Sequence, residues 1–401
     1  MDEMQMIAEM LDERPAEAAA DTGRRRLRKE IAAPARRTPS WFGLRFKAGL
    51  GVVAAGTAAA VAITAVGSGA PAPPGSPSQV ELADRAVLAA ADKAAAQPIG
   101  KYWSSGWISG QSYIVRAETG DYAIVGAQTE FFRWSGAKSG MGEAFYGREL
   151  PARLHTARDK ELWKKAGSPP EFRVWSNDHY YTYGRKATEW EVDDPDPAGG
   201  GNWLGGRTVE DFQRLPTDPE KLAAMFFVPR GSRKIMDPRK LRQAEERVGE
   251  HSGRLRTPPP MTAFHKLFLV ENMLQDAPVP PAVRAGLMRA LAAQPGVRSV
   301  GERTDPLGRE GVALAADRET SRITGEWGAP EAERGEYDSR AELIFDRETG
   351  EMLAAQNVLT RPGGPYRDRE PGFVIDYSVV RDSGWTDTRP KPAEKLPSWP
   401  L

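Results

Sequence analysis

An uncharged run near the N-terminus constrains this chain more than any other feature. Residues Ala48 to Val66 read AGLGVVAAGTAAAVAITAV, 19 positions without a charged side chain. As a helix rising about 1.5 Å per residue, this run would span roughly 28 Å, the thickness of a bilayer's hydrocarbon core. Trp41, Phe42 and Phe46 precede it, where aromatic residues suit the membrane interface. The sequence therefore predicts one transmembrane helix over residues 48–66.

The charges on either side of this run predict its orientation. Nine basic residues lie between Arg24 and Lys47 against the single acid Glu30, whereas Gly67 to Val80 carries no charge. Basic flanks stay on the cytoplasmic side of a membrane. We expect a single-pass protein of the cell membrane with a cytoplasmic N-terminus.

Two alternatives exist for the same run. A cleaved signal peptide would use Ser68 and Ala70 as the small residues of the cleavage site, but its basic region would be far too long and Pro71 would follow the cut. A buried core helix would not need the asymmetric basic flank or the Pro/Gly/Ser-rich segment that follows. A membrane anchor accounts for all of these features together.

The extreme N-terminus carries a narrow apolar stripe within an acidic segment, here called the N-terminal stripe: Met4, Ile7, Met10 and Leu11. Its i, i+3, i+6, i+7 spacing places these side chains on one helix face. One reading is a helix that folds into the groove of a cytoplasmic partner, and the other is a frayed terminus with incidental methionines. The basic residues 24–29 suit contact with anionic lipid and membrane orientation.

Composition shifts divide the chain into five parts. We expect a cytoplasmic basic segment (1–47), the transmembrane helix (48–66), a Pro/Gly/Ser linker (67–79), an extracytoplasmic domain (80–388) and a loose proline-rich tail (389–401).

The extracytoplasmic part alternates between strand and helix patterns. Tyr-, Trp- and Val-rich stretches at 102–134 and 172–192 predict strands, and hairpin patterns follow from residue 297 to 380. Between them, apolar periodicity and helix stop signals predict helices at about 80–97, 218–227, 239–250, 261–275 and 281–294. Helices grouped before a run of hairpins favour an α+β domain, an antiparallel sheet with helices on one face.

No arrangement of residues in this sequence indicates catalysis or a bound metal. The chain has no Cys, and its four histidines (His155, His179, His251 and His265) lack the paired spacing of a zinc site. With 55 basic and 55 acidic residues, the chain also lacks the overall positive charge of a nucleic-acid-binding protein. We expect no enzyme activity, no cofactor, no metal site and no nucleic-acid partner.

Three local patterns are explained by ordinary structure rather than by catalysis or ligand binding. Ser135 and Lys138 have the spacing by which a lysine activates a serine, but the accompanying motifs of such sites are missing. The glycine-rich run 199–206 reads as a flexible loop rather than a phosphate-binding turn. The acids in TEWEVDDPDP (189–197) alternate as on the solvent face of a strand.

Aromatic residues gather in the first β-rich half, among them Tyr102, Trp103, Trp107, Tyr113 and Trp134. They fit either an ordinary core or the lining of an apolar groove, and the sequence leaves both open.

The order of these parts resembles a known family. The residues that carry the resemblance are the basic N-terminal segment, the anchor, GKYW (100–103), LPTDPEKL (215–222), DAPVPPAVRAGLMRALAAQPGV (276–297), TDPLGREGVAL (304–314) and ELIFDRETGEML (342–353). They resemble an actinobacterial family of single-pass membrane proteins of unknown function that are often encoded beside extracytoplasmic-function sigma factors. The outer domain is also loosely similar to the half-barrels of lipoprotein-carrier-like proteins.

The resemblance implies a non-enzymatic envelope protein. Such a protein would bind or sense an apolar or lipid ligand outside the membrane and regulate a cytoplasmic sigma factor. The alternative is a membrane-tethered carrier or chaperone for lipids or lipoproteins, and a hydrolase ranks third.

Overall fold

The computed structural model describes residues 85–89, 99–228 and 261–400. The chain divides into two compact units, Met1–Gly69 and Ala70–Leu401, and every described residue belongs to the second. The predicted transmembrane helix, the linker, the N-terminal stripe and the helix predicted over 239–250 all lie outside the described residues. Within the described part, none of the helices combines the length and the apolar character needed to cross a bilayer.

Two long strands begin the sheet. β1 (Tyr102–Val115) and β2 (Tyr122–Gly136) carry the Trp, Tyr, Ile and Val residues that favour strands, and they pair antiparallel along almost their whole length. Gly120 closes the turn between them with a φ of 121°, a value that suits glycine.

The next segments enlarge this side of the sheet and add a small hairpin. They are β3 (Glu143–Glu149), β4 (Arg153–Leu154), helix α5 (Ala157–Lys165), the hairpin of β5 (Glu171–Ser176) and β6 (His179–Gly184), and β7 (Glu191–Asp196). Helix α5 was not expected from the sequence because its nine residues are mostly charged and show no apolar stripe. A cap at Thr156, whose side chain accepts from the Asp159 N–H, begins this helix.

Helices then gather in the middle of the chain. They are the 3-10 turn η1 (Leu204–Gly206), α6 (Val209–Gln213), α7 (Pro219–Phe226), α9 (Ala263–Asp276) and α10 (Pro281–Ala292). The helices predicted at 218–227, 261–275 and 281–294 are confirmed. Asp218 caps α7, and its carboxylate accepts from the Lys221 N–H at 2.9 Å.

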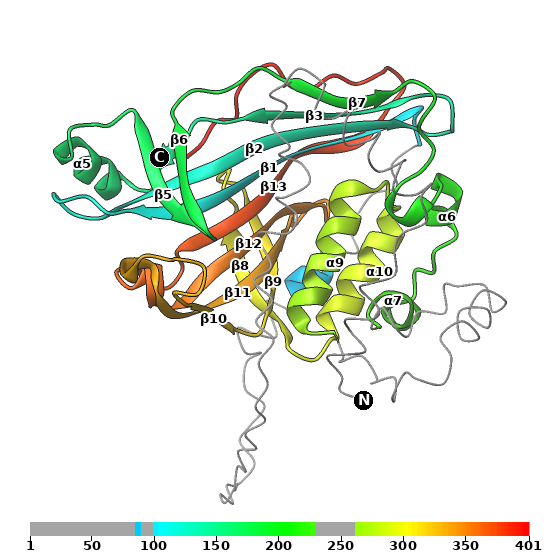
Figure 1. The fold of residues 1–401 in the computed structure, drawn as a ribbon. Coiled ribbons are helices and arrows are strands. Elements are labelled where there is room, and N and C mark those ends of the chain that lie inside the picture. Colours follow the sequence, from blue (N-terminus) through cyan, green and yellow to red (C-terminus); the bar gives the residue numbers. More distant parts are fainter. Residues whose placement is uncertain (1–84, 90–98, 229–260, 401) are drawn as a thin grey trace, which may run out of the picture. The chain divides into compact units, whose positions relative to one another are not determined.

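The C-terminal part supplies six more strands. They are β8 (Val297–Thr304), β9 (Glu310–Ala316), β10 (Glu319–Ile323), β11 (Gly335–Phe345), β12 (Met352–Arg361) and β13 (Val374–Thr386), with 3-10 turns η3 (Glu331–Glu333) and η4 (Gly364–Tyr366). The sheet order is β7-β3-β2-β1-β13-β12-β11-β9-β8, with β4 beside β2 and β10 beside β11. The last strand thus lies between β1 and β12 and joins the two ends of the domain (Figure 1).

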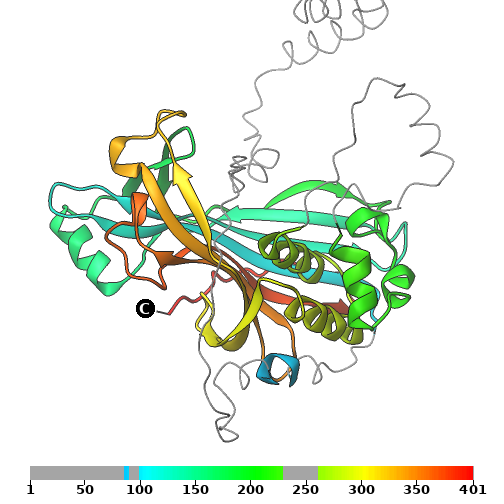
Figure 2. The ribbon, with the colours of Figure 1, turned by 90° about the horizontal axis from the view of Figure 1, so that it is seen from below.

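One face of this sheet is covered by helices (Figures 1 and 2). Helix α9 contacts β1, β9, β11 and β12, and α10 contacts α7 and α9. Leu267 and Val270 of α9 and Leu287 of α10 are fully buried in the same apolar cluster as Leu314 and Leu343 of the sheet. The molecule therefore has the α+β architecture that the sequence predicted, built mainly on an antiparallel sheet.

The opposite face carries a second apolar cluster with Ile108, Ile344 and Val379 at its centre. The prolines of the C-terminal tail predicted a loose segment, and residues 389–400 form no helix or strand. The tail nevertheless lies along this face of the sheet (Figure 1). Its Trp399 packs against the cluster.

Candidate functional site

A row of polar side chains crosses three neighbouring strands on the helix-covered face. Asp376 of β13 is paired with Gln111 of β1 on one side and with Asn357 of β12 on the other. Directly opposed residues of antiparallel strands project from the same face, so these three side chains form one line, called here the polar row. Within the row, Asn357 Nδ2 lies 3.5 Å from Asp376 Oδ2.

Helix α9 brings a second carboxyl group to this row. Ser378, two residues after Asp376, donates from its hydroxyl to Gln275 Oε1 of α9 at 2.7 Å, which shows that Gln275 faces the sheet. Glu271 precedes Gln275 by one helical turn and therefore lies on the same side of α9. Glu271 and Asp376 are close enough for the charge of Asp376 to raise the pKa of Glu271.

Both carboxyl groups are shifted toward their neutral forms. Burial, followed by the charges of Asp376 and Asp276, raises the pKa of Glu271 to about 8. Burial also raises the pKa of Asp376 to about 6, against a smaller opposing effect of the Asn357 hydrogen bond. Asp376 is nevertheless an exposed residue, so water reaches its carboxyl group.

No described cation balances these two acids. The charged groups that influence the pKa of Glu271 are both carboxylates, and no charged group of the described chain influences that of Asp376. Burial raises the pKa of Asp276, the last residue of α9, to about 6 against the opposing effects of the Arg133 charge and a Gln275 hydrogen bond. The pair of Glu271 and Asp376 is thus an acidic site without a built-in counter-ion.

Tyrosine hydroxyls border the other end of the row. Tyr113 of β1 donates to Gln111 Oε1 at 3.2 Å, and its hydroxyl lies 3.2 Å from that of Tyr183 on β6. The two rings stack with centroids 5.3 Å apart. Gly126 makes this approach possible, because a Cβ there would lie 2.7 Å from the Tyr183 ring. The polar row therefore extends from the tyrosines of β1 and β6 to helix α9.

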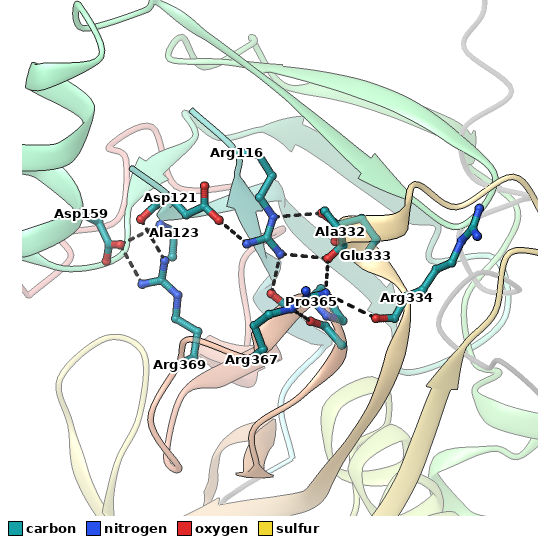
Figure 3. Close-up of polar contacts among 11 residues, drawn as sticks. Arg116, Asp121, Ala123, Asp159, Ala332, Glu333, Arg334, Pro365, Arg367 and Arg369 are labelled. Atoms are coloured by element: carbon teal, nitrogen blue, oxygen red, sulfur yellow. Dashed lines mark hydrogen bonds and ion pairs between the residues drawn. The ribbon is translucent and has the colours of Figure 1, made fainter. Parts of the chain in front are cut away.

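A larger polar network at the turn between β1 and β2 is satisfied by the protein itself (Figure 3). Arg116 binds Asp121 at 2.5 Å, Glu333 at 3.4 Å and the Pro365 carbonyl at 2.9 Å. In the same figure, Arg369 binds Asp159 of α5 at 2.9 Å. These contacts tie the β1–β2 turn to α5, η3 and η4, so we assign the network a structural role.

The patterns singled out in the sequence do not converge on a reactive centre. The Ser135 hydroxyl donates to Glu143 at 3.3 Å rather than to Lys138. In the glycine-rich run, Gly200 and Gly201 have positive φ and Trp203 is buried. Burial lowers the pKa of His155 to about 4, and its ring stacks on Phe373. Within the described ranges, no group of three or more His, Asp or Glu side chains is placed to hold a metal ion.

Neither a scan against protein-family models nor a search of curated proteins finds a match to this sequence. The candidate site therefore depends on its geometry alone. Sequence reasoning missed both of its acids, although each stands out afterwards: Asp376 interrupts the strand FVIDYSVV, and Glu271 interrupts the helix segment FLVENML. The N-terminal stripe, for which the sequence left a partner-binding helix and a frayed terminus both open, lies outside the described residues.

Proposed function

We propose that this chain is a membrane-anchored binding protein whose outer domain recognises a ligand with a cationic amine and an apolar body. The proposal depends on one observation: Asp376 lies close enough to Glu271 for its charge to act on that acid, no described cation influences the pKa of either acid, and Asp376 is exposed to water. An ammonium group placed between them would supply the missing charge. The half-buried ring of Tyr183, which stacks on Tyr113, would contact the rest of the ligand.

The anchor and the signalling role come from the sequence. The uncharged run 48–66 and its basic flank support an extracytoplasmic position for the domain, and the family resemblance supports a sigma factor as the cytoplasmic partner. In this proposal, ligand binding outside is the input and the N-terminal stripe is the contact inside.

Dansylcadaverine is a suitable probe because it joins a primary amine to an aromatic body. We expect saturable binding to the full chain, followed by dansyl fluorescence. Asp376→Asn and Glu271→Gln should each weaken it by about tenfold, because each removes a negative charge next to the ammonium. Asp382→Asn is the matched control: it lies on the same strand, and burial raises its pKa as well. Equal loss in all three variants, or no loss in any, would reject the site.

A second candidate is a tethered carrier of lipids or lipoproteins. The indole N–H groups of Trp103 and Trp203 favour it, because both are buried in the helix-covered cluster and neither has an acceptor. An ester carbonyl of a bound lipid could accept there. Lipid recovered by organic extraction from the purified chain, and lost in Trp203→Phe, would favour the carrier.

A further inference from the structure

The C-terminal tail is held in an unusual way. Residues 389–400 form no helix or strand. Among the described residues, no backbone-to-backbone hydrogen bond joins this tail to the sheet. Side chains of the domain bind it instead.

Three side chains donate hydrogen bonds to consecutive main-chain carbonyls of the tail. Trp190 Nε1 donates to the Ala393 carbonyl at 2.9 Å. Arg148 donates to the carbonyls of Glu394 and Lys395 at 3.2 and 3.1 Å. Arg381 also donates to the Lys395 carbonyl, at 2.8 Å. Because the acceptors are backbone atoms, this recognition is independent of the tail's side chains at these positions.

The donors are fixed by the domain rather than by the tail. Glu130 of β2 is 2% exposed and accepts from both Arg148 Nε, at 2.8 Å, and Arg381. The Arg148 guanidinium also lies over the Trp190 ring, 4.4 Å from its centroid. A buried carboxylate on a central strand thus orients two guanidinium groups toward the face where the tail lies.

Aromatic rings and guanidinium groups complete the contact at both ends of the tail. Arg389 lies over Trp134 at 4.9 Å, Trp399 packs edge-on against Tyr377 at 6.1 Å, and Arg153 covers Trp399 at 4.5 Å. The bound segment RPKPAEKLPSWP contains four prolines. Proline-rich segments prefer the extended polyproline II form, which leaves carbonyls free for recognition and loses little entropy on binding.

We infer that this surface is a binding site for an extended, proline-containing peptide, and that the chain's own tail occupies it as an internal competitor. The site has prearranged donors for main-chain carbonyls and aromatic rings that contact Arg389 and Trp399 near the two ends of the tail. Its present occupant lacks the strand pairing that would make it a permanent part of the sheet. A peptide of the same kind from another chain would bind by displacing the tail.

The test uses a fluorescein-labelled peptide of residues 388–400 and fluorescence anisotropy. It compares the full wild-type chain with a full chain whose tail is loosened by Pro397→Gly and Trp399→Ala. We expect the peptide to bind the loosened chain at least tenfold more tightly, because its own tail competes less. Adding Arg381→Gln to the loosened chain should reverse most of that gain. A peptide with glycine at the four proline positions should bind more weakly.

Arg148→Gln is a second test of the donors, with thermal melting to verify that the chain remains folded. If it does not fold, Arg381→Gln decides, because that side chain is only partly buried. Equal binding to the wild-type and loosened chains, no binding to either, or binding that survives Arg381→Gln unchanged would each overturn the inference.

Discussion

At the residue scale, the domain places two acids where burial disfavours their charged forms, Glu271 on helix α9 and Asp376 on strand β13. A strand or helix that places an acid against apolar neighbours loses stability whenever that acid must ionise. Glu271 carries this cost, and no described cation reduces it. Acids whose pKa values are shifted in this way are often found at functional sites.

The pKa of Glu271 predicts how stability should change with pH. Its folded pKa of about 8 exceeds the ordinary value of 4.5, so the folded state holds a proton that the unfolded state has lost. The free energy of unfolding should therefore fall as pH rises from about 4.5 to 8. Glu271→Gln removes this fall, and the variant should be more stable than wild type by on the order of 1 to 3 kcal/mol at pH 8.5.

Thermal melts between pH 4.5 and 9 measure this effect. The two proteins should melt at similar temperatures near pH 4.5 and diverge as pH rises. Glu302→Gln, on an exposed side chain, is the control. A constant difference across the range would show that Glu271 does not titrate in this way.

At the element scale, the packing of α10 against α7 explains a glycine that helix propensity alone would disfavour. Gly286 lies in the interior of α10, where glycine costs about 1 kcal/mol relative to alanine. A Cβ there would lie 2.5 Å from the Thr217 carbonyl oxygen and 2.6 Å from Leu222 Cδ1 of α7. The glycine therefore permits the close contact between α7 and α10.

Gly286→Ala should consequently destabilise the domain, by about 1 to 3 kcal/mol, despite the gain in helix propensity. Chemical denaturation measures the difference. Gly184→Ala is the matched control, because nothing lies within 4 Å of its Cβ position, and its effect should be small. A more stable Gly286→Ala protein would mean that α7 and α10 do not pack as described.

Elements with strong local signals were predictable from the sequence, and those set by tertiary contacts were not. Helix α10 has a proline start, an apolar stripe and a Pro-Gly stop, and it forms where predicted. Helix α5 lacks such a stripe; Asp159, which accepts from the Ala123 N–H at 2.7 Å, attaches it to the sheet. The polar row was also beyond sequence reasoning, because the pairing of β1 with β13 joins residues more than 200 positions apart.

At the scale of the whole molecule, the pairing of β1 with β13 joins the N-terminal and C-terminal strands of the domain into one sheet. Strand β13 lies between β1 and β12, so the C-terminal hairpins complete the sheet that the first strands begin. A chain cut near residue 230 should give two fragments that are insoluble or molten alone and that regain cooperative unfolding when refolded together. Two separately folded, monomeric fragments would contradict a shared sheet.

If Glu271 and Asp376 bind an amine, the binding should release a proton. At pH 7 Glu271, with a pKa of about 8, is mostly protonated, and an ammonium beside it should drive the proton off. Calorimetric titration of the full chain with dansylcadaverine, in buffers of different ionisation enthalpy, measures that release. We predict release of about one proton per ligand at pH 7, none at pH 9.5, and none at pH 7 in Glu271→Gln. Binding without proton release at pH 7, or release that persists in Glu271→Gln, would contradict the account.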